Sequence, residues 1–142
     1  MIENVGHISL DKLTKHAELL KESNAPIMPL GPLPTDTAEN MDHIANAVGG
    51  AYGAFIGIAH VINSVTRFEH SQSLITPEVT LEAIRSAKIA AQIADLSRNI
   101  PNALIHEKRI TDKRKNLHSC ISDGTLCVRC SNVCPLKILP YD

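Results

Sequence analysis

The chain has 142 residues, and its 14 Lys and Arg nearly balance 15 Asp and Glu, which gives a formal net charge of -1. This length is sufficient to bury a hydrophobic core without disulfide bonds. A net charge near zero provides no long-range field for nucleic acid or an anionic membrane, so neither is expected as a partner. Residues 1–10 carry no signal segment and the apolar run 54–62 is too short to span a bilayer, so we expect a cytoplasmic protein.

The first half of the chain alternates predicted helices with short apolar stretches. A helix is expected over 11–22, a strand over 26–30 that ends at a Gly-Pro-rich turn, a helix over 41–51 and a second buried strand over 56–65. This β/α alternation is typical of a parallel sheet. Residues 1–75 are therefore predicted to be an α/β region.

At residue 76 the pattern changes to that of a long helix, ending near residue 99. It opens with Thr-Pro-Glu, which are a capping threonine, a proline suited to the first helical position and a carboxylate that complements the helix dipole. Its alanines, at 83, 87, 90, 91 and 94, leave room for another helix, expected over 103–117. Residues 76–118 are therefore predicted to be a helical region.

All four cysteines lie between Cys120 and Cys134, and the last three have the spacing C-x2-C-x3-C. In a reducing compartment such a cluster indicates metal or redox chemistry more than disulfides. Short spacings let one loop direct several thiolates at an iron-sulfur cluster, and Cys-Pro is common in ferredoxins. Four cysteines would also satisfy a closed redox cluster or a structural zinc ion, so these alternatives stay open. Residues 119–142 are the predicted cluster-binding tail.

Six segments in order resemble the last third of phosphomethylpyrimidine synthase, a family of radical S-adenosyl-L-methionine (SAM) enzymes of thiamine biosynthesis. They are MIENVGH (1–7), LGPLPTD (30–36), DHI with VGGA (42–44, 48–51), VTRFEH (65–70), KIAAQIAD (88–95) and the final cysteines. The resemblance covers nearly the whole chain. It implies the C-terminal part of a (β/α)8 TIM-type barrel, followed by a helical pair and an iron-sulfur tail. The family's large N-terminal region has no counterpart here.

The resemblance also implies a reaction and its residues. A reduced [4Fe-4S] cluster cleaves SAM to a 5'-deoxyadenosyl radical, which rearranges aminoimidazole ribotide into hydroxymethylpyrimidine phosphate in a carbon-carbon lyase reaction. By correspondence, the catalytic cluster ligands are Cys127, Cys130 and Cys134, the zinc ligands are His7 and His70, and the substrate ligand is Glu3. Without the resemblance, seven histidines in such a domain would be expected to make ordinary surface or hydrogen-bonded contacts.

Several residues depart from the family pattern. The cysteine spacing is one residue shorter than the family's C-x2-C-x4-C, Met28 replaces a substrate-contacting tyrosine and Arg67 replaces a proline. Whether Cys120 is a cluster ligand stays open. Three hypotheses follow. In the first, the chain is a fragment or split subunit, and it forms a homo-oligomer or binds a partner chain that carries the missing barrel strands. In the second, it is a paralogue of the benzimidazole-forming type. In the third, it is a non-catalytic electron-transfer module.

Two further features have ordinary interpretations. Asp42 and His43 lie near the end of an expected strand, where barrel folds place active-site loops, but they also suit the start of a solvated helix. The basic residues within 108–115 are interpreted as a solvated helix face, because no aromatic residues are interleaved with them.

Overall fold

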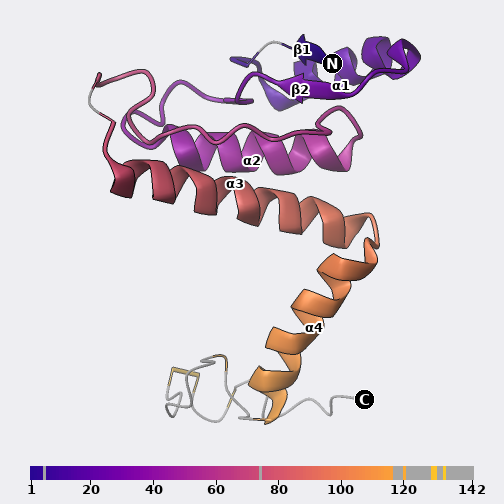
Figure 1. The fold of residues 1–142 in the computed structure, drawn as a ribbon, viewed down its shortest axis with the longest axis vertical. Coiled ribbons are helices and arrows are strands. Elements are labelled where there is room, and N and C mark those ends of the chain that lie inside the picture. Colours follow the sequence, from indigo (N-terminus) through magenta and orange to yellow (C-terminus); the bar gives the residue numbers. More distant parts are fainter. Residues whose placement is uncertain (5, 74, 117–119, 121–128, 131–132, 134–142) are drawn as a thin grey trace. The chain divides into compact units, whose positions relative to one another are not determined.

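The computed structural model describes residues 1–4, 6–73, 75–116, 120, 129–130 and 133. The chain divides into two compact units, Met1–Arg98 and Asn99–Asp142. In the first unit the elements are β1 (Ile2–Asn4), α1 (Leu10–Leu20), a 3-10 turn (Lys21–Ser23), β2 (Ile27–Pro29), α2 (Asp42–Phe55) and α3 (Pro77–Ser97), and the second contains α4 (Pro101–Asn116) (Figure 1). The predicted division into 1–75, 76–118 and 119–142 stays a prediction.

Strands β1 and β2 pair in parallel, and α1 is the connection that crosses between them. Parallel strands cannot be joined by a tight turn, so a helical crossover is the usual solution. The apolar side of α1 places Leu13, which is 0% exposed, in a core with Ile27 and Ile58. Beyond the strands the pairing continues in an isolated bridge between His7 and Leu33. The parallel pairing of β1 with β2 thereby places His7 beside Leu33, shortly after the end of β2.

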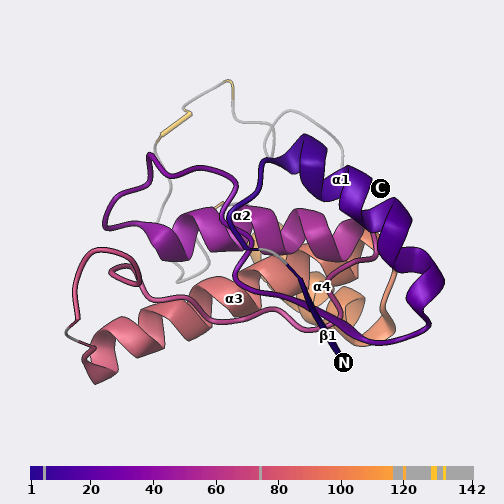
Figure 2. The same cartoon turned by 90° about the horizontal axis from the view of Figure 1, so that it is seen from above.

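Helix α2 lies between the β1-α1-β2 unit and α3 (Figures 1 and 2). Its glycines, Gly49 among them, are buried and leave space for the irregular segments 29–33 and 58–65. Helix α3 buries a stripe of small side chains: Ala83, Ala87, Ala90 and Ala94. The sequence predicts that these alanines pack against the helix 103–117. In the first unit, the helix that packs against α3 is α2.

The prediction of an α/β fold built from the C-terminal part of a (β/α)8 TIM-type barrel is wrong. The described residues are mostly helical, and their strands are the two three-residue segments β1 and β2. The predicted strand 56–65 is irregular: its amides of His60 and Val61 both donate to the Ile27 carbonyl, at 2.8 and 3.3 Å. The Ile27 N–H donates to the His60 imidazole Nδ1 at 3.0 Å. Because a side chain accepts the hydrogen bond that a third strand would need, the ladder does not extend.

The remaining predicted elements are confirmed. The helices expected over 11–22, 41–51, 76–99 and 103–117 and the strand over 26–30 correspond to α1, α2, α3, α4 and β2, with shifted bounds. Thr76 caps α3, since its Oγ1 accepts a hydrogen bond from the Val79 N–H at 3.4 Å. Asn99 follows α3 with a left-handed φ of 57°. None of the helices in the described part of the chain is long and apolar enough to cross a membrane.

Candidate functional site

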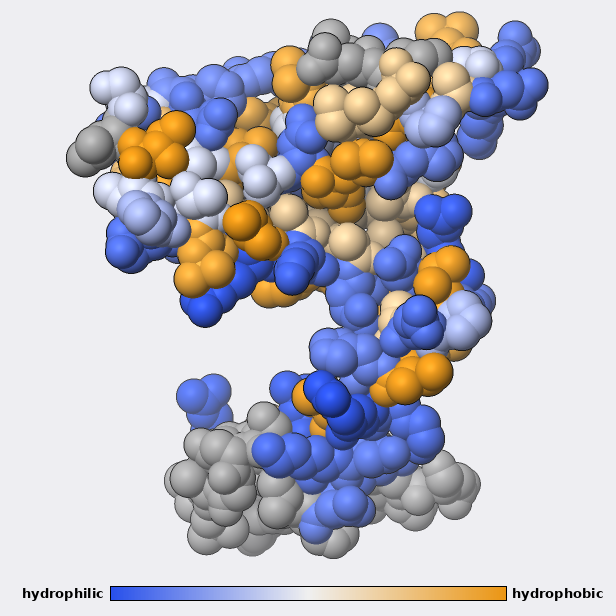
Figure 3. Space-filling model, viewed as in Figure 1, coloured by the Kyte–Doolittle hydropathy of each residue, from blue (hydrophilic) through white to orange (hydrophobic). Residues whose placement is uncertain are grey.

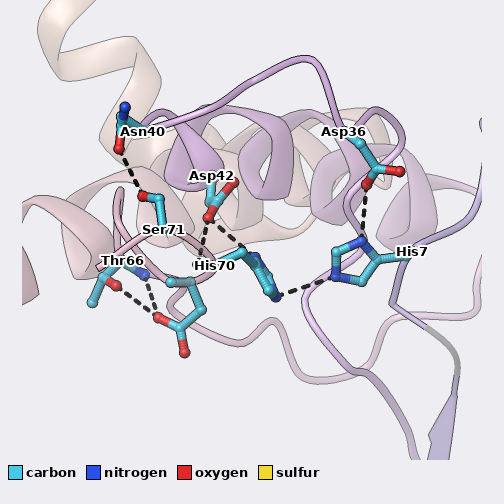
Figure 4. Close-up of polar contacts among 8 residues, drawn as sticks. His7, Asp36, Asn40, Asp42, Thr66, His70 and Ser71 are labelled. Carbon is cyan, nitrogen blue, oxygen red and sulfur yellow. Dashed lines mark hydrogen bonds and ion pairs between the residues drawn. The ribbon is translucent and has the colours of Figure 1, made fainter. Parts of the chain in front are cut away.

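His7 and His70 lie side by side although 63 positions separate them, with their Nε2 atoms 3.2 Å apart (Figure 4). Their ring centroids are 4.6 Å apart and the ring planes are inclined at 83°. His7 is placed by the bridge to Leu33, whose N–H donates to the Gly6 carbonyl at 2.7 Å. His70 belongs to the turn that lies against the first residue of α2. The histidine pair therefore joins the end of the strand unit to the start of a helix.

An aspartate holds each ring from behind. His7 Nδ1 lies 3.0 Å from Asp36 Oδ1, and His70 Nδ1 lies 3.1 Å from Asp42 Oδ2. Asp42 Oδ2 also accepts the backbone N–H of His70 at 3.1 Å. A carboxylate accepts but does not donate, so each Nδ1 carries the proton and each Nε2 presents a lone pair. This arrangement is typical of metal-bound histidines, where the carboxylate fixes the ring and increases its basicity.

The geometry of the two Nε2 atoms has a chemical consequence. Two lone pairs that face each other at 3.2 Å repel unless a proton or a metal cation lies between them. Two imidazole nitrogens on a tetrahedral zinc ion are about 3.3 Å apart, given Zn–N distances of about 2.0–2.1 Å. The pair fits two ligands of such an ion. Among the residues with described positions, no group of three His, Cys, Asp or Glu side chains is placed to hold a metal.

The turn that carries His70 is held by side-chain hydrogen bonds. The Thr66 backbone N–H and hydroxyl donate to Glu69 Oε2 at 3.1 and 2.7 Å. The Ser71 hydroxyl donates to Asn40 Oδ1 at 2.6 Å, which ties the turn to the loop before α2 (Figure 4). These contacts limit the positions open to the His70 ring.

Two pockets of about 400 Å³ each lie at the histidine pair. His7, Leu33 and His70 line both of them. The first pocket mixes apolar and polar groups and is completed by Leu30, Gly31, Asn63, Ser64, Val65 and Glu69. The second is polar, with the carboxylates of Asp36, Glu39 and Asp42. His7 and His70 thus both border spaces of small-molecule size.

The other predicted site residues are not joined to the histidine pair by a described contact. Glu3 lies in β1 opposite Met28, and its side chain is not described. Cys130 is exposed, as is Cys120, and both lie in the second unit. Cys127 and Cys134 lie outside the described residues.

Sequence reasoning missed Asp36 and Asp42 as partners of the histidines. Asp36 ends the segment LGPLPTD, and Asp42 begins the segment DHI. Both aspartates stand in segments that had already been singled out as motifs. A search of those motifs for carboxylates would have found them.

The bridge between His7 and Leu33, the start of α2 and the carboxylate-backed histidines together define a candidate metal-binding site. The sequence matches the model of the Radical SAM ThiC family over residues 1–124, so the chain belongs to this family. It is similar to phosphomethylpyrimidine synthase 2 of Methanothermobacter thermautotrophicus, with 33% identity over the whole chain and 38% of that protein. It is also similar to the phosphomethylpyrimidine synthases of Thermotoga petrophila and Methanococcus aeolicus, with 42% and 39% identity over 82% of the chain. The chain spans only 27% of each of these two proteins.

Proposed function

We propose that this chain supplies the zinc-binding part of a phosphomethylpyrimidine synthase, which converts aminoimidazole ribotide into hydroxymethylpyrimidine phosphate for thiamine biosynthesis. The observation that carries the proposal is the pairing of His7 with His70, each backed by an aspartate. Relatives named for this activity match between 82% and 100% of the chain, which supports it. The class of reaction is that of a radical-SAM carbon-carbon lyase.

In this proposal His7 and His70 bind a zinc ion through Nε2. Two protein ligands leave coordination positions for water or for a polar group of the substrate. Asp36 and Asp42 keep the protons of both rings on Nδ1 and hold the rings in place. Glu3, four residues before His7 along the chain, is the proposed substrate ligand.

The cysteine tail is the proposed site of the [4Fe-4S] cluster, with Cys127, Cys130 and Cys134 as ligands and SAM bound at the open iron. When bound, the cluster supplies the electron that cleaves SAM. The Cys130 thiol is exposed and therefore accessible to an incoming cluster. Cys120 is not a ligand in this proposal.

An exposed apolar stripe on α2 supports the proposal that further polypeptide packs against this helix. The stripe consists of Met41, Ile44, Val48 and Phe55, which are 49–59% exposed. The ionisable side chains of α2 are Asp42 and His43 in its first turn and one tyrosine, Tyr52. A helix that is apolar nearly all round is normally buried, and the first unit shows apolar side chains at its surface (Figure 3). We propose that the part of the family protein outside this chain, as a partner or as further sequence, covers the stripe.

The test is complementation in an anaerobic assay with dithionite, SAM and aminoimidazole ribotide. The chain, loaded with zinc, iron and sulfide, is assayed alone and together with the part of the Methanothermobacter relative that it does not match. We expect pyrimidine phosphate only from the mixture, because a radical reaction needs a closed pocket that excludes water. 5'-Deoxyadenosine is scored separately. Absence of both products from a mixture that has bound zinc and cluster would contradict the proposal.

A further inference from the structure

A single carboxylate in α3 contacts basic side chains from two other segments. Glu82 Oε1 lies 3.5 Å from His43 Nε2 in the first turn of α2. Its other oxygen, Oε2, lies 3.5 Å from Arg67 Nε in the turn that carries His70. Glu82 thereby joins α2, α3 and the turn that carries His70, which are three separate segments of the chain.

 

Both side chains that Glu82 contacts lie next to the groups that hold His70. His43 follows Asp42 directly in α2. The Arg67 carbonyl accepts a hydrogen bond from the Asp42 N–H at 3.4 Å. Asp42 Oδ2 in turn accepts hydrogen bonds from the His70 backbone N–H and Nδ1, both at 3.1 Å. A continuous set of contacts therefore runs from Glu82 to the His70 ring.

Burial makes the charge of Glu82 important. The His43 side chain is 7% exposed, and His43 Nδ1 and Arg67 Nε are buried atoms without a hydrogen-bond partner among the described residues. A partly buried guanidinium needs a counter-charge, because desolvation of an unpaired cation is costly. The Phe68 ring, 5.5 Å from Arg67 Cζ, adds a cation-π contact but no negative charge. Glu82 supplies that charge.

We infer that Glu82 is a positioning residue for the histidine pair. Through His43 and Arg67 it holds the start of α2 against the turn 66–70, and this fixes Asp42 on His70. The inference rests on the proposed zinc function, because it concerns how the zinc ligands are held.

The test compares Glu82→Gln with the matched control Glu78→Gln. Glu78 lies one turn earlier on α3 and its carboxylate contacts its own backbone N–H and Thr76, so the control removes the same charge without breaking the contacts of Glu82. Zinc affinity is measured on the full chain by competition with a chromophoric chelator. We expect Glu82→Gln to weaken zinc binding about tenfold and Glu78→Gln to leave it unchanged. Equal losses in both variants would overturn the inference.

A double variant tests the route through Asp42. If Glu82 acts by fixing Asp42, Asp42→Asn combined with Glu82→Gln binds zinc no more weakly than Asp42→Asn alone. Additive losses would contradict this route. Thermal unfolding of each variant separates a loss of ligand geometry from a loss of fold. If Glu82→Gln does not fold, Glu82→Asp, which keeps the charge, is used in its place.

A second readout keeps the inference separate from the proposed function. In ¹⁵N-labelled protein without metal, the His70 Nδ1 proton is expected to exchange with water faster in Glu82→Gln than in wild type or Glu78→Gln. If the wild-type chain binds no zinc, the proposed function fails, while this exchange measurement still tests the positioning role. An unchanged exchange rate in Glu82→Gln would overturn that role.

Discussion

Gly49 of α2 lies against the backbone of Pro32, so closely that an added Cβ would come within 2.1 Å of the Pro32 carbonyl oxygen and 2.8 Å of its carbonyl carbon. The neighbouring residue, Leu33, forms the bridge to His7. Contact between helix and backbone at Gly49 therefore sets where the segment that carries this bridge can lie.

Replacing Gly49 with alanine is expected to destabilise the fold by about 1–3 kcal/mol, because backbone atoms must move to admit the methyl group. Gly53→Ala, in the same helix, is the control. Its Cβ would be 3.5 Å from Ala59 Cβ, an ordinary contact, and alanine is favoured over glycine in a helix by about 1 kcal/mol. Urea unfolding followed by circular dichroism measures both. Equal stability of the two variants would argue against the close contact at Gly49.

The histidine pair predicts a graded effect on zinc binding. His7→Ala and His70→Ala are expected to abolish it, since each removes one of the two proposed ligands. Asp36→Asn and Asp42→Asn are expected to weaken it about 10–100-fold, because each carboxylate fixes the tautomer of its ring.

The control for these variants is His106→Ala, which removes an exposed histidine of α4. Isothermal titration with zinc measures all five proteins beside the wild type. The metal site is disproved if the His106 variant loses as much affinity as those of the pair.

The cysteine tail predicts a different pattern. Replacing Cys127, Cys130 or Cys134 with serine is expected to abolish the visible charge-transfer absorption of the anaerobically reconstituted protein, since their thiolates are the proposed cluster ligands. Cys120→Ser is the control and is expected to keep the absorption and the bound iron. Loss of the cluster in Cys120→Ser as well would show a four-cysteine site and favour the electron-transfer module.

The start of α3 predicts a dependence of stability on pH. The backbone N–H of Glu78 and the Thr76 side chain hold the pKa of the Glu78 carboxyl below its usual value. A lowered pKa means that the folded state favours the carboxylate. This contribution is present above the usual glutamate pKa and is lost as the pH falls through the lowered one.

Glu78→Gln is therefore expected to flatten the acid side of a plot of Tm against pH. Glu107→Gln, which removes an exposed carboxylate of α4, is the control and is expected to follow the wild-type curve. Identical acid limbs for wild type and Glu78→Gln would contradict the role of the carboxylate at this helix start.

The helices were predictable because their signals are local. The cap at Thr76 and the apolar spacing of α1 depend on residues a few positions apart. The irregular segment 56–65 was mistaken for a strand because its apolar residues are those of a buried strand. What stops the ladder is the hydrogen bond from the Ile27 N–H to His60, a contact across 33 positions that no local pattern reports.

The site was predictable only in part for the same reason. Nothing in the spacing of His7 and His70 indicates that they meet, and only the resemblance to a family paired them. The roles of Asp36 and Asp42 depend on which way the rings turn, and a linear motif does not specify that. Glu82 stands in no motif and was not singled out.

The two pockets that share His7 and His70 have a consequence for how substrate and water reach the site. An ion held between the two rings would adjoin two pockets, one mixed in character and one rich in carboxylates. A substrate bound in the first pocket would leave the second pocket open to water. Substrate and water would then reach the ion from different pockets.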